Sequence, residues 1–276
     1  MLGKLIKHEF IDNWKLLVLL DGLTIIVGAI LGLYINALLN ADDYSNSTPL
    51  IMTMGFTLYV LILPSLGTIT LIYIGVRYYK SLYSSQGYLT FTLPATTNEI
   101  LFSKMLVAYI FELINILCII LSFGLVMWGI VSWSIDNSYY MSTVFTNLWE
   151  DMSEYFYDVP VAISGIFCAL TRLIYFLMTF FFAISLGQLW QKHRIIGAIV
   201  SYFGIKIVIS IVYTFIKIAL ANNDISDTVD ISYYSDVNVG SLFVMAAIIK
   251  AVEYLLVSAV MYFGCVYITK HKLNLE

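Results

Sequence analysis

Five ionisable residues fall inside long apolar stretches of the chain, where charged side chains are rare. They are Glu112, Arg172, Lys206, Lys250 and Glu253. A charge at the centre of a bilayer costs about 2.5–3.5 kcal/mol on insertion scales, so such residues seldom face lipid. The chemistry open to them is ion pairing, exchange of a proton or ion, or contact with a transported cargo. We therefore predict an intramembrane set of charges that lines a translocation path or holds helices together.

Partners for these charges are partly predictable from spacing. Lys250 and Glu253 are three positions apart on one expected helix and can pair locally. Arg172 lies about thirteen residues into its apolar run, close to mid-membrane at about 1.5 Å per residue. Glu112 is a candidate partner for it if the two depths agree, and for Arg172 a structural ion pair and a cavity-lining role both stay open. Asp21 is expected close enough to a helix end to reach the headgroups.

The chain has no motif for hydrolysis, metal binding or nucleotide binding. It contains no H-E-x-x-H, C-x-x-C, G-x-S-x-G or G-x-x-x-x-G-K-[ST] sequence. The three histidines share no ligand spacing, and the three cysteines fall in expected helices, which predicts no disulfide framework: His8, His193, His271, Cys118, Cys168 and Cys265. We expect no catalytic residue, metal or cofactor in this chain, and the energy for any uphill movement must come from a partner or an ion gradient.

Composition places these residues in a membrane protein. Hydrophobic residues make up 61% of the 276 positions and charged residues 12%, against about 45–50% and about 25% in soluble domains. About 20 helical residues cross the hydrocarbon layer. Six apolar runs are long enough, so we predict an all-α membrane protein of one domain (1–276) with six transmembrane helices, at roughly 16–39, 51–76, 100–134, 159–190, 195–221 and 241–268.

The polar segments sort by charge. Those at 40–50, 135–158 and 222–240 contain acidic residues and no Lys or Arg, whereas the basic residues cluster before the first run, between alternate runs and after the last. The positive-inside rule then places both termini in the cytoplasm and the acidic loops, including 135–158 and 222–240, outside. The net charge of −4 averages two opposite faces and gives no indication of nucleic-acid binding.

The first 15 residues precede the first apolar run and have an amphipathic pattern. Leu2, Ile6, Phe10 and Trp14 recur every four residues, while Lys4, His8, Asp12 and Lys15 lie on the other helical face. This pattern predicts a helix at the membrane interface, with an ordinary basic lead-in to the first span as the alternative.

The segment 77–99 is the longest expected cytoplasmic connection and carries more apolar surface than a solvated linker. Gly87 permits a turn, and Pro94 disfavours helix at the residue before it. Thr96 or Thr97 can cap the following helix, and Glu99 has the right distance from Thr96 to complete a capping box. We therefore predict a structured cytoplasmic hairpin here.

The run QGYLTFTLPATTNEILFSK, residues 86–104, resembles a segment of bacterial type-two ATP-binding-cassette exporter permeases. Gln86 stands where that family has an acidic residue, and Ala95-Thr96 where it has Val-Ser. The resemblance implies a six-helix subunit that dimerises and binds two copies of a separate ATPase through a coupling helix in 77–99. The coupling residues it implies are Gln86, Gly87, Tyr88, Leu89, Phe91, Pro94, Thr97 and Glu99.

The function expected from these observations is ATP-driven export of an amphipathic or hydrophobic cargo, with peptides favoured weakly, from a bacterial cell membrane. The chain itself would not be an enzyme. Two other classes stay open: an ion-coupled secondary transporter that uses Glu112, Arg172 and Glu253, and a non-transporting scaffold or sensor that recruits a cytosolic protein.

Overall fold

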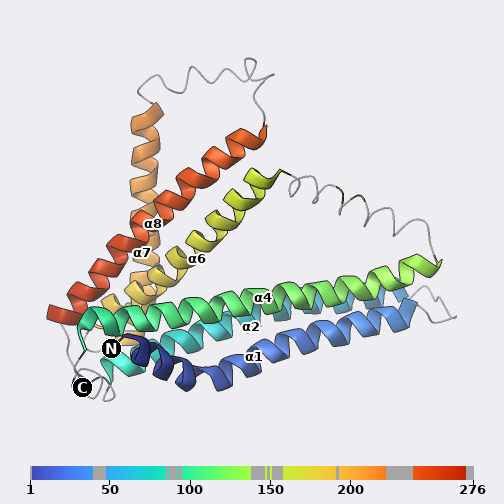
Figure 1. The fold of residues 1–276 in the computed structure, drawn as a ribbon, viewed down its shortest axis with the longest axis horizontal. Coiled ribbons are helices and arrows are strands. Elements are labelled where there is room, and N and C mark those ends of the chain that lie inside the picture. The colour runs from blue at the N-terminus through green and yellow to red at the C-terminus, as the bar shows by residue number, and fades with distance from the viewer. Residues whose placement is uncertain are drawn as a thin grey trace. The chain divides into compact units, whose positions relative to one another are not determined.

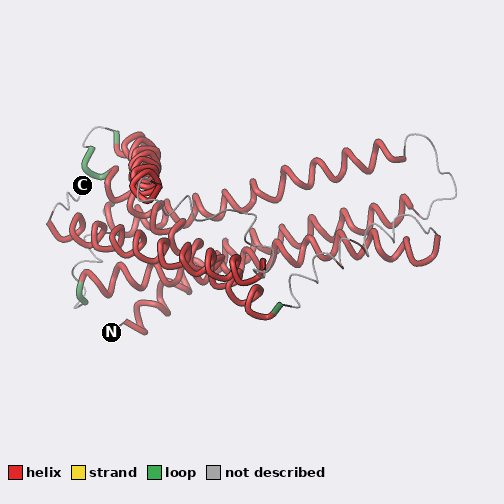
Figure 2. The backbone as a smooth tube through the Cα atoms, turned by 90° about the horizontal axis from the view of Figure 1, so that it is seen from above, coloured by secondary structure: helices red, strands yellow, loops and turns green. Residues whose placement is uncertain are grey.

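The computed structural model describes residues 2–39, 48–84, 87, 92, 95–137, 147, 150, 158–190, 193–221 and 239–271. These residues form long helices and contain no strand, as Figure 2 shows. The helices are α1 (Leu2–Leu39), α2 (Thr48–Tyr83), α4 (Thr97–Asn137), α6 (Val159–Gly187), α7 (Arg194–Ala221) and α8 (Val239–His271).

All six helices are long and apolar enough to cross a membrane. The predicted all-α architecture with six membrane-length helices is thus confirmed, and the chain is a multi-pass membrane protein. The helices of 38, 36 and 41 residues that begin at Leu2, Thr48 and Thr97 far exceed the roughly 20 residues that a hydrocarbon layer requires. Their polar ends must therefore extend beyond it.

The chain forms two compact units. The first unit comprises residues 1–77 and 102–154, and the second comprises residues 78–101 and 155–276. Helices α2 and α4 therefore each contribute residues to both units. The last turns of α2 and the first turn of α4 belong to the second unit.

In the first unit, α1, α2 and α4 run side by side (Figure 1). Three contacts join α1 to α4 in rising order along both helices: Glu9 with Lys104, Asp21 with Asn115, and Thr24 with Ser122. The two helices are therefore parallel. Tyr59 and Thr70 of α2 contact Ser122 and Asn115 in falling order, so α2 is antiparallel to both.

Close approach of α1 and α4 depends on small residues. A Cβ atom added to Gly28 would lie 2.6 Å from the backbone oxygen of Ser122, and one added to Gly32 would lie 2.5 Å from that of Leu125. No side chain fits at either position without moving the backbone of α4. Small residues at such crossings are typical of helix packing in membranes, where close van der Waals contact replaces the hydrophobic effect.

In the second unit, α6 packs against both α7 and α8. Tyr175 and Ser185 of α6 contact Tyr254 and Cys265 of α8 in rising order, so these helices are parallel. Helix α7 is antiparallel to α6, because Gly187 lies at Ala198 while Tyr175 lies at Lys206. The directions within each unit thus alternate with chain order, as six successive crossings require.

The N-terminal segment belongs to α1 itself. The helix is continuous from Leu2 to Leu39, and its first turns run at an angle to the remainder in Figure 1. In this part the Asn13 side chain donates a hydrogen bond of 2.7 Å to the Glu9 carbonyl oxygen. Such a bond competes with the backbone ladder and commonly bends a helix.

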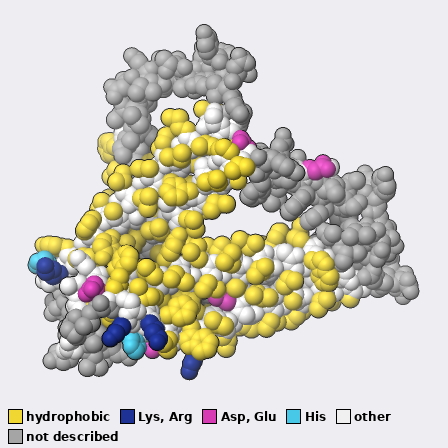
Figure 3. Space-filling model, in the orientation of Figure 1, with side chains coloured by type: hydrophobic (Ala, Val, Ile, Leu, Met, Phe, Trp, Pro, Cys, Tyr) yellow, Lys and Arg dark blue, Asp and Glu magenta, His cyan; other side chains and the backbone are white. Residues whose placement is uncertain are grey.

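The side chains exposed on the helices are of the types expected in a membrane protein. Figure 3 shows hydrophobic side chains over the helix surfaces, with Lys and Arg side chains near the start of α1 and near the end of α8. Helix α7 is the least buried of the six helices, because only 6% of its most apolar 18-residue stretch is buried. Large exposed apolar side chains along it, such as Ile195, Phe203 and Phe215, suit contact with lipid.

Candidate functional site

The predicted cytoplasmic connection is shorter than its sequence range. Residues 77–83 are the last turns of α2 and residues 97–99 the first turn of α4, so the connection proper spans 84–96. The Gly87 N–H donates a 2.7 Å hydrogen bond to the Ser84 carbonyl oxygen, which closes a turn at the end of α2. Five implied coupling residues lie outside the described residues: Gln86, Tyr88, Leu89, Phe91 and Pro94.

A capping box opens α4, as the sequence predicts. The Glu99 N–H donates to Thr96 Oγ1 at 3.3 Å, and the Thr96 N–H donates to Glu99 Oε2 at 3.0 Å. Two free backbone donors at the helix start are thereby satisfied. Thr97, the other candidate cap, is the first residue of the helix instead. Because the box is built from local hydrogen bonds, the four residues that make it were sufficient to predict it.

The end of α2 is anchored in the second unit by two tyrosines. The Tyr83 hydroxyl donates a 2.9 Å hydrogen bond to Ser185 Oγ of α6 and lies 3.2 Å from Thr269 Oγ1 of α8. The Tyr78 hydroxyl lies 3.2 Å from the same Ser185 oxygen, and its ring packs on Phe181 with centroids 4.4 Å apart. Both tyrosines are almost fully buried.

Through Tyr83, the last turn of α2 contacts both α6 and α8, directly before the connection begins. The sequence indicated that the apolar surface of this segment must be covered, but it gave no indication of which helices cover it. Ser185 and Thr269 carried no signal, because single hydroxyl residues are common in membrane helices.

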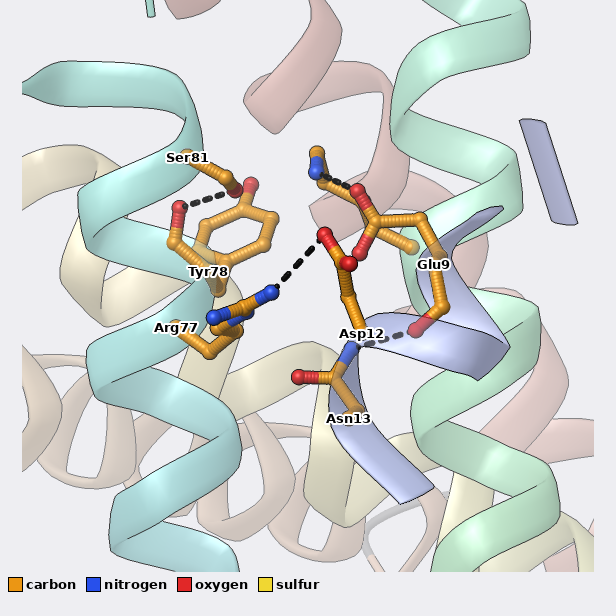
Figure 4. A network of polar contacts seen from close by, with 7 residues as sticks. Glu9, Asp12, Asn13, Arg77, Tyr78 and Ser81 are labelled. Atoms are coloured by element: carbon orange, nitrogen blue, oxygen red, sulfur yellow. Dashed lines mark hydrogen bonds and ion pairs between the residues drawn. The ribbon is translucent and has the colours of Figure 1, made fainter. Parts of the chain in front are cut away.

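Two ion pairs hold the beginning of α1 against the helices that flank the connection. Figure 4 shows Arg77 of α2 directed at Asp12 of α1, with the Arg77 Nη2 to Asp12 Oδ2 distance at 2.9 Å. Glu9, one turn earlier on α1, pairs with Lys104 of α4. In the sequence, Arg77 and Lys104 belong to the basic clusters that indicate which side of the membrane is cytoplasmic. Their acidic partners lie about 65 and 95 positions away, so no local pattern identified them.

The two ion pairs differ in environment. Lys104 is buried, whereas the Arg77 and Asp12 side chains are 35% and 65% exposed. Exposed pairs contribute little because water and salt screen them. Removing one member of the buried pair leaves an uncompensated charge, which is far more costly. The Glu9–Lys104 pair is therefore the stronger constraint on the start of α4.

The predicted pairing of Lys250 and Glu253 is present. Lys250 Nζ lies 2.8 Å from Glu253 Oε2 and donates a 2.9 Å hydrogen bond to the Tyr213 hydroxyl of α7. The same ammonium group lies 4.2 Å from the centroid of the Tyr213 ring. This cluster neutralises one acid and one base of the intramembrane set and joins α7 to α8.

The other two cations of the predicted intramembrane set are Lys206 and Arg172, and their surroundings differ. Lys206 Nζ lies 4.9 Å from the Tyr175 ring centroid and 5.7 Å from that of Tyr202, so aromatic faces stabilise its charge. Arg172 is exposed and has no ion-pair partner among the residues that the structure describes. Glu112 belongs to the first unit and Arg172 to the second, so their pairing stays a prediction.

Glu112 and Asp21 lie in a buried polar cluster of the first unit, together with Thr70 and Asn115. Asn115 Nδ2 donates a 2.8 Å hydrogen bond to Asp21 Oδ1 and lies 3.5 Å from Thr70 Oγ1. Asp21 is 5% exposed and Glu112 is 7% exposed. Asp21, which was expected near a helix end, instead lies within α1, and its side chain is buried against Asn115 of α4.

The described residues offer no group of three or more His, Cys, Asp or Glu side chains arranged for a metal ion. Comparison with protein-family models, curated proteins and solved structures finds no match to this chain. The resemblance of residues 86–104 to exporter permeases therefore rests on those residues alone.

Proposed function

We propose that this chain is the membrane subunit of an ATP-driven exporter in a bacterial cell membrane. Two copies assemble and bind two copies of a cytoplasmic ATPase, which holds the ATP and Mg²⁺. The cargo is amphipathic or hydrophobic, and we favour a peptide. Both termini are cytoplasmic, the beginning of α1 lies at the inner membrane interface, and residues 77–99 form the coupling hairpin.

One observation carries this proposal: residues 78–101 belong to the second unit, while the remaining parts of α2 and α4 belong to the first. A protein docked on residues 84–96 therefore acts on both units. The tyrosine anchor to Ser185 and Thr269 and the capping box at Thr96 hold the two ends of the connection by hydrogen bonds, which suits transmission of a rigid-body movement.

The exposed residues at the start of α1 also support it. Phe10, Ile11 and Trp14 are exposed and apolar, and Trp is typical of the membrane interface. Glu9 and Asp12 of the same segment bind Lys104 and Arg77, which flank the hairpin. An interfacial helix would thus brace the coupling hairpin from the membrane side.

Arg172 is the cargo-contact candidate that we favour among the intramembrane charges. It is exposed and without an ion-pair partner in the described residues, whereas Lys250 and Glu253 neutralise each other. An unpaired cation at membrane depth seldom faces lipid. A path lined by a second copy of the chain would give it a polar environment.

The test is recruitment of the ATPase by the chain in its native membrane. Tyr88→Ala, Leu89→Ala and Phe91→Ala are compared with Phe263→Ala, which removes a 69% exposed aromatic ring from α8. We expect the hairpin variants to fold and to lose both the co-purifying ATPase and cargo export, and the control to keep both. Recruitment and export that survive all three hairpin substitutions would falsify the proposal.

The same experiment separates the two other classes. Export driven by an ion gradient with no ATPase present indicates an ion-coupled carrier. A soluble partner that lacks a phosphate-binding loop and binds without any export indicates a scaffold or sensor.

A further inference from the structure

Buried polar side chains gather in the interior of the first unit, between the ion pairs near the start of α1 and the contact of Asp21 with Asn115. The cluster comprises Asn13 and Asp21 on α1, Thr70 on α2, and Glu112 and Asn115 on α4. None of them is more than 7% exposed. All five lie within the helix segments that are long and apolar enough to cross the membrane.

Contacts along the parallel helices bracket the level of Asn13 and Glu112. Glu9 pairs with Lys104, and twelve residues later on α1 Asp21 binds Asn115, eleven residues after Lys104. Asn13 lies between Glu9 and Asp21 on α1, and Glu112 lies between Lys104 and Asn115 on α4. Both therefore lie in the section of the helix bundle between these two contacts.

Two oxygen atoms in this section have no hydrogen-bond partner among the described residues. They are Oε1 of Glu112 and Oδ1 of Asn13, and both are buried. The other end of the Asn13 amide is engaged, because its Nδ2 donates to the Glu9 carbonyl oxygen. Both orphaned atoms are hydrogen-bond acceptors when Glu112 is ionised, so neither can satisfy the other.

Glu112 has no ion-pair partner among the described residues. The like charge of Asp21 acts on it from α1. Arg77 of α2 is paired with Asp12, and Lys104 of α4 is paired with Glu9. Lys15 of α1 is exposed, so the section holds no buried cation besides the paired Lys104 among the described residues. Two ionised carboxylates in such a buried, apolar section are a costly arrangement.

We propose that the interior of the first unit is a proton-binding site in which Glu112 holds the proton, with Asp21 and Asn13 as the other groups of the site. Protonation removes one of the two negative charges. It also converts a carboxylate, which only accepts hydrogen bonds, into a group with one O–H donor, which matches the free acceptor oxygen of Asn13. The proton comes from water and returns to water, and no other bond changes.

Protonation of this site should also affect the contact between α1 and α4, whatever the energy source of transport. Glu112 and Asp21 lie where α1 and α4 contact each other, one helical turn or less from the Asp21–Asn115 hydrogen bond. Loss of the proton adds a second buried charge at this contact. The packing of α1 against α4 should therefore weaken as the pH rises, in the first unit alone.

Infrared spectroscopy of the full chain in lipid nanodiscs tests the site directly. A protonated carboxylic acid has a carbonyl stretching band that a carboxylate lacks. We expect this band at neutral pH in the wild-type protein, its loss in Glu112→Gln, and its retention in Glu253→Gln, where the acid removed is paired with Lys250. Absence of the band from the wild-type protein at neutral pH, or its persistence in Glu112→Gln, overturns the proposal.

A second variant covers the case in which Glu112→Gln does not fold. Asp21→Asn removes the like charge that disfavours ionisation of Glu112 and keeps the shape of the side chain. We expect its protonated-acid band to disappear at a lower pH than in the wild-type protein. A band that titrates at the same or a higher pH contradicts the assignment of Glu112 and Asp21 to one site.

Discussion

The hydroxyl group of Tyr83 donates a hydrogen bond of 2.9 Å to Ser185 Oγ, 102 positions further along the chain. Both residues are almost fully buried. This contact fastens the last turn of α2 to α6, directly before the connection to α4, and Thr269 brings α8 to the same hydroxyl. The segment that we propose to bind the ATPase therefore begins at a three-helix junction.

Tyr83→Phe should weaken this junction without altering its packing volume. Interhelical hydrogen bonds of this kind contribute about 0.5–1.5 kcal/mol, and we expect a loss of that size in the free energy of unfolding in mild detergent. If the junction transmits movement, stimulation of the ATPase by cargo should fall further than its binding. Tyr79→Phe is the matched control, since no described residue bonds to the Tyr79 hydroxyl. Equal effects of the two substitutions would show that the Tyr83 hydroxyl has no special role.

Thr96→Ala should destabilise the start of α4. It removes the side-chain acceptor for the Glu99 N–H, and loss of a helix cap typically costs about 1 kcal/mol. Thr97→Ala, one residue inside the helix, should change stability by a few tenths of a kcal/mol at most. Hydrogen exchange of the amides in residues 97–101 measures the difference, and faster exchange is expected only in Thr96→Ala.

Gly28→Ala should separate α1 from α4, because the added Cβ atom meets the backbone of Ser122. Overpacking of this kind costs about 1–3 kcal/mol. Gly22→Ala and Gly124→Ala serve as controls, since an added Cβ has no atom within 4 Å at either position. These controls should be neutral or slightly stabilising, given the higher helix propensity of Ala. Thermal unfolding of the three purified variants tests the ranking.

Arg172→Met should mainly reduce export, whereas Lys206→Met should mainly reduce stability. Arg172 has no described ion-pair partner, so its replacement should change the free energy of unfolding by less than about 0.5 kcal/mol while reducing export. Lys206→Met removes two cation–π contacts, worth about 0.5–2 kcal/mol. Folded yield and export are measured for both. Loss of the folded protein in Arg172→Met would make it a structural residue instead.

Lys250 and Glu253 should show strong coupling in a double-mutant cycle. Lys250→Met leaves Glu253 without its cation, and Glu253→Gln leaves Lys250 with only the Tyr213 hydroxyl. The double variant should be more stable than the sum of the single losses predicts, with an interaction energy of about 0.5–3 kcal/mol. Additive losses would mean that Lys250 and Glu253 do not stabilise each other.

Local features were predictable because their causes lie within a few residues. The six apolar runs identify the helices, the spacing of Thr96 and Glu99 identifies the capping box, and the spacing of Lys250 and Glu253 identifies their ion pair. The continuation of α2 to Tyr83 was missed, since the polar and aromatic residues 77–83 end the apolar pattern that marks a membrane span. They stay helical because Tyr78, Leu82 and Tyr83 are buried in the second unit.

The sequence by itself determined that this protein is an all-α, multi-pass membrane protein, since hydropathy over about 20 residues decides whether a helix enters the bilayer. Only the tertiary structure decided which polar groups meet: Glu9 with Lys104, Asp21 with Asn115, and Tyr83 with Ser185. Such pairs depend on helix register and rotation, which are set by packing between distant parts of the chain. No pattern within one helix encodes them.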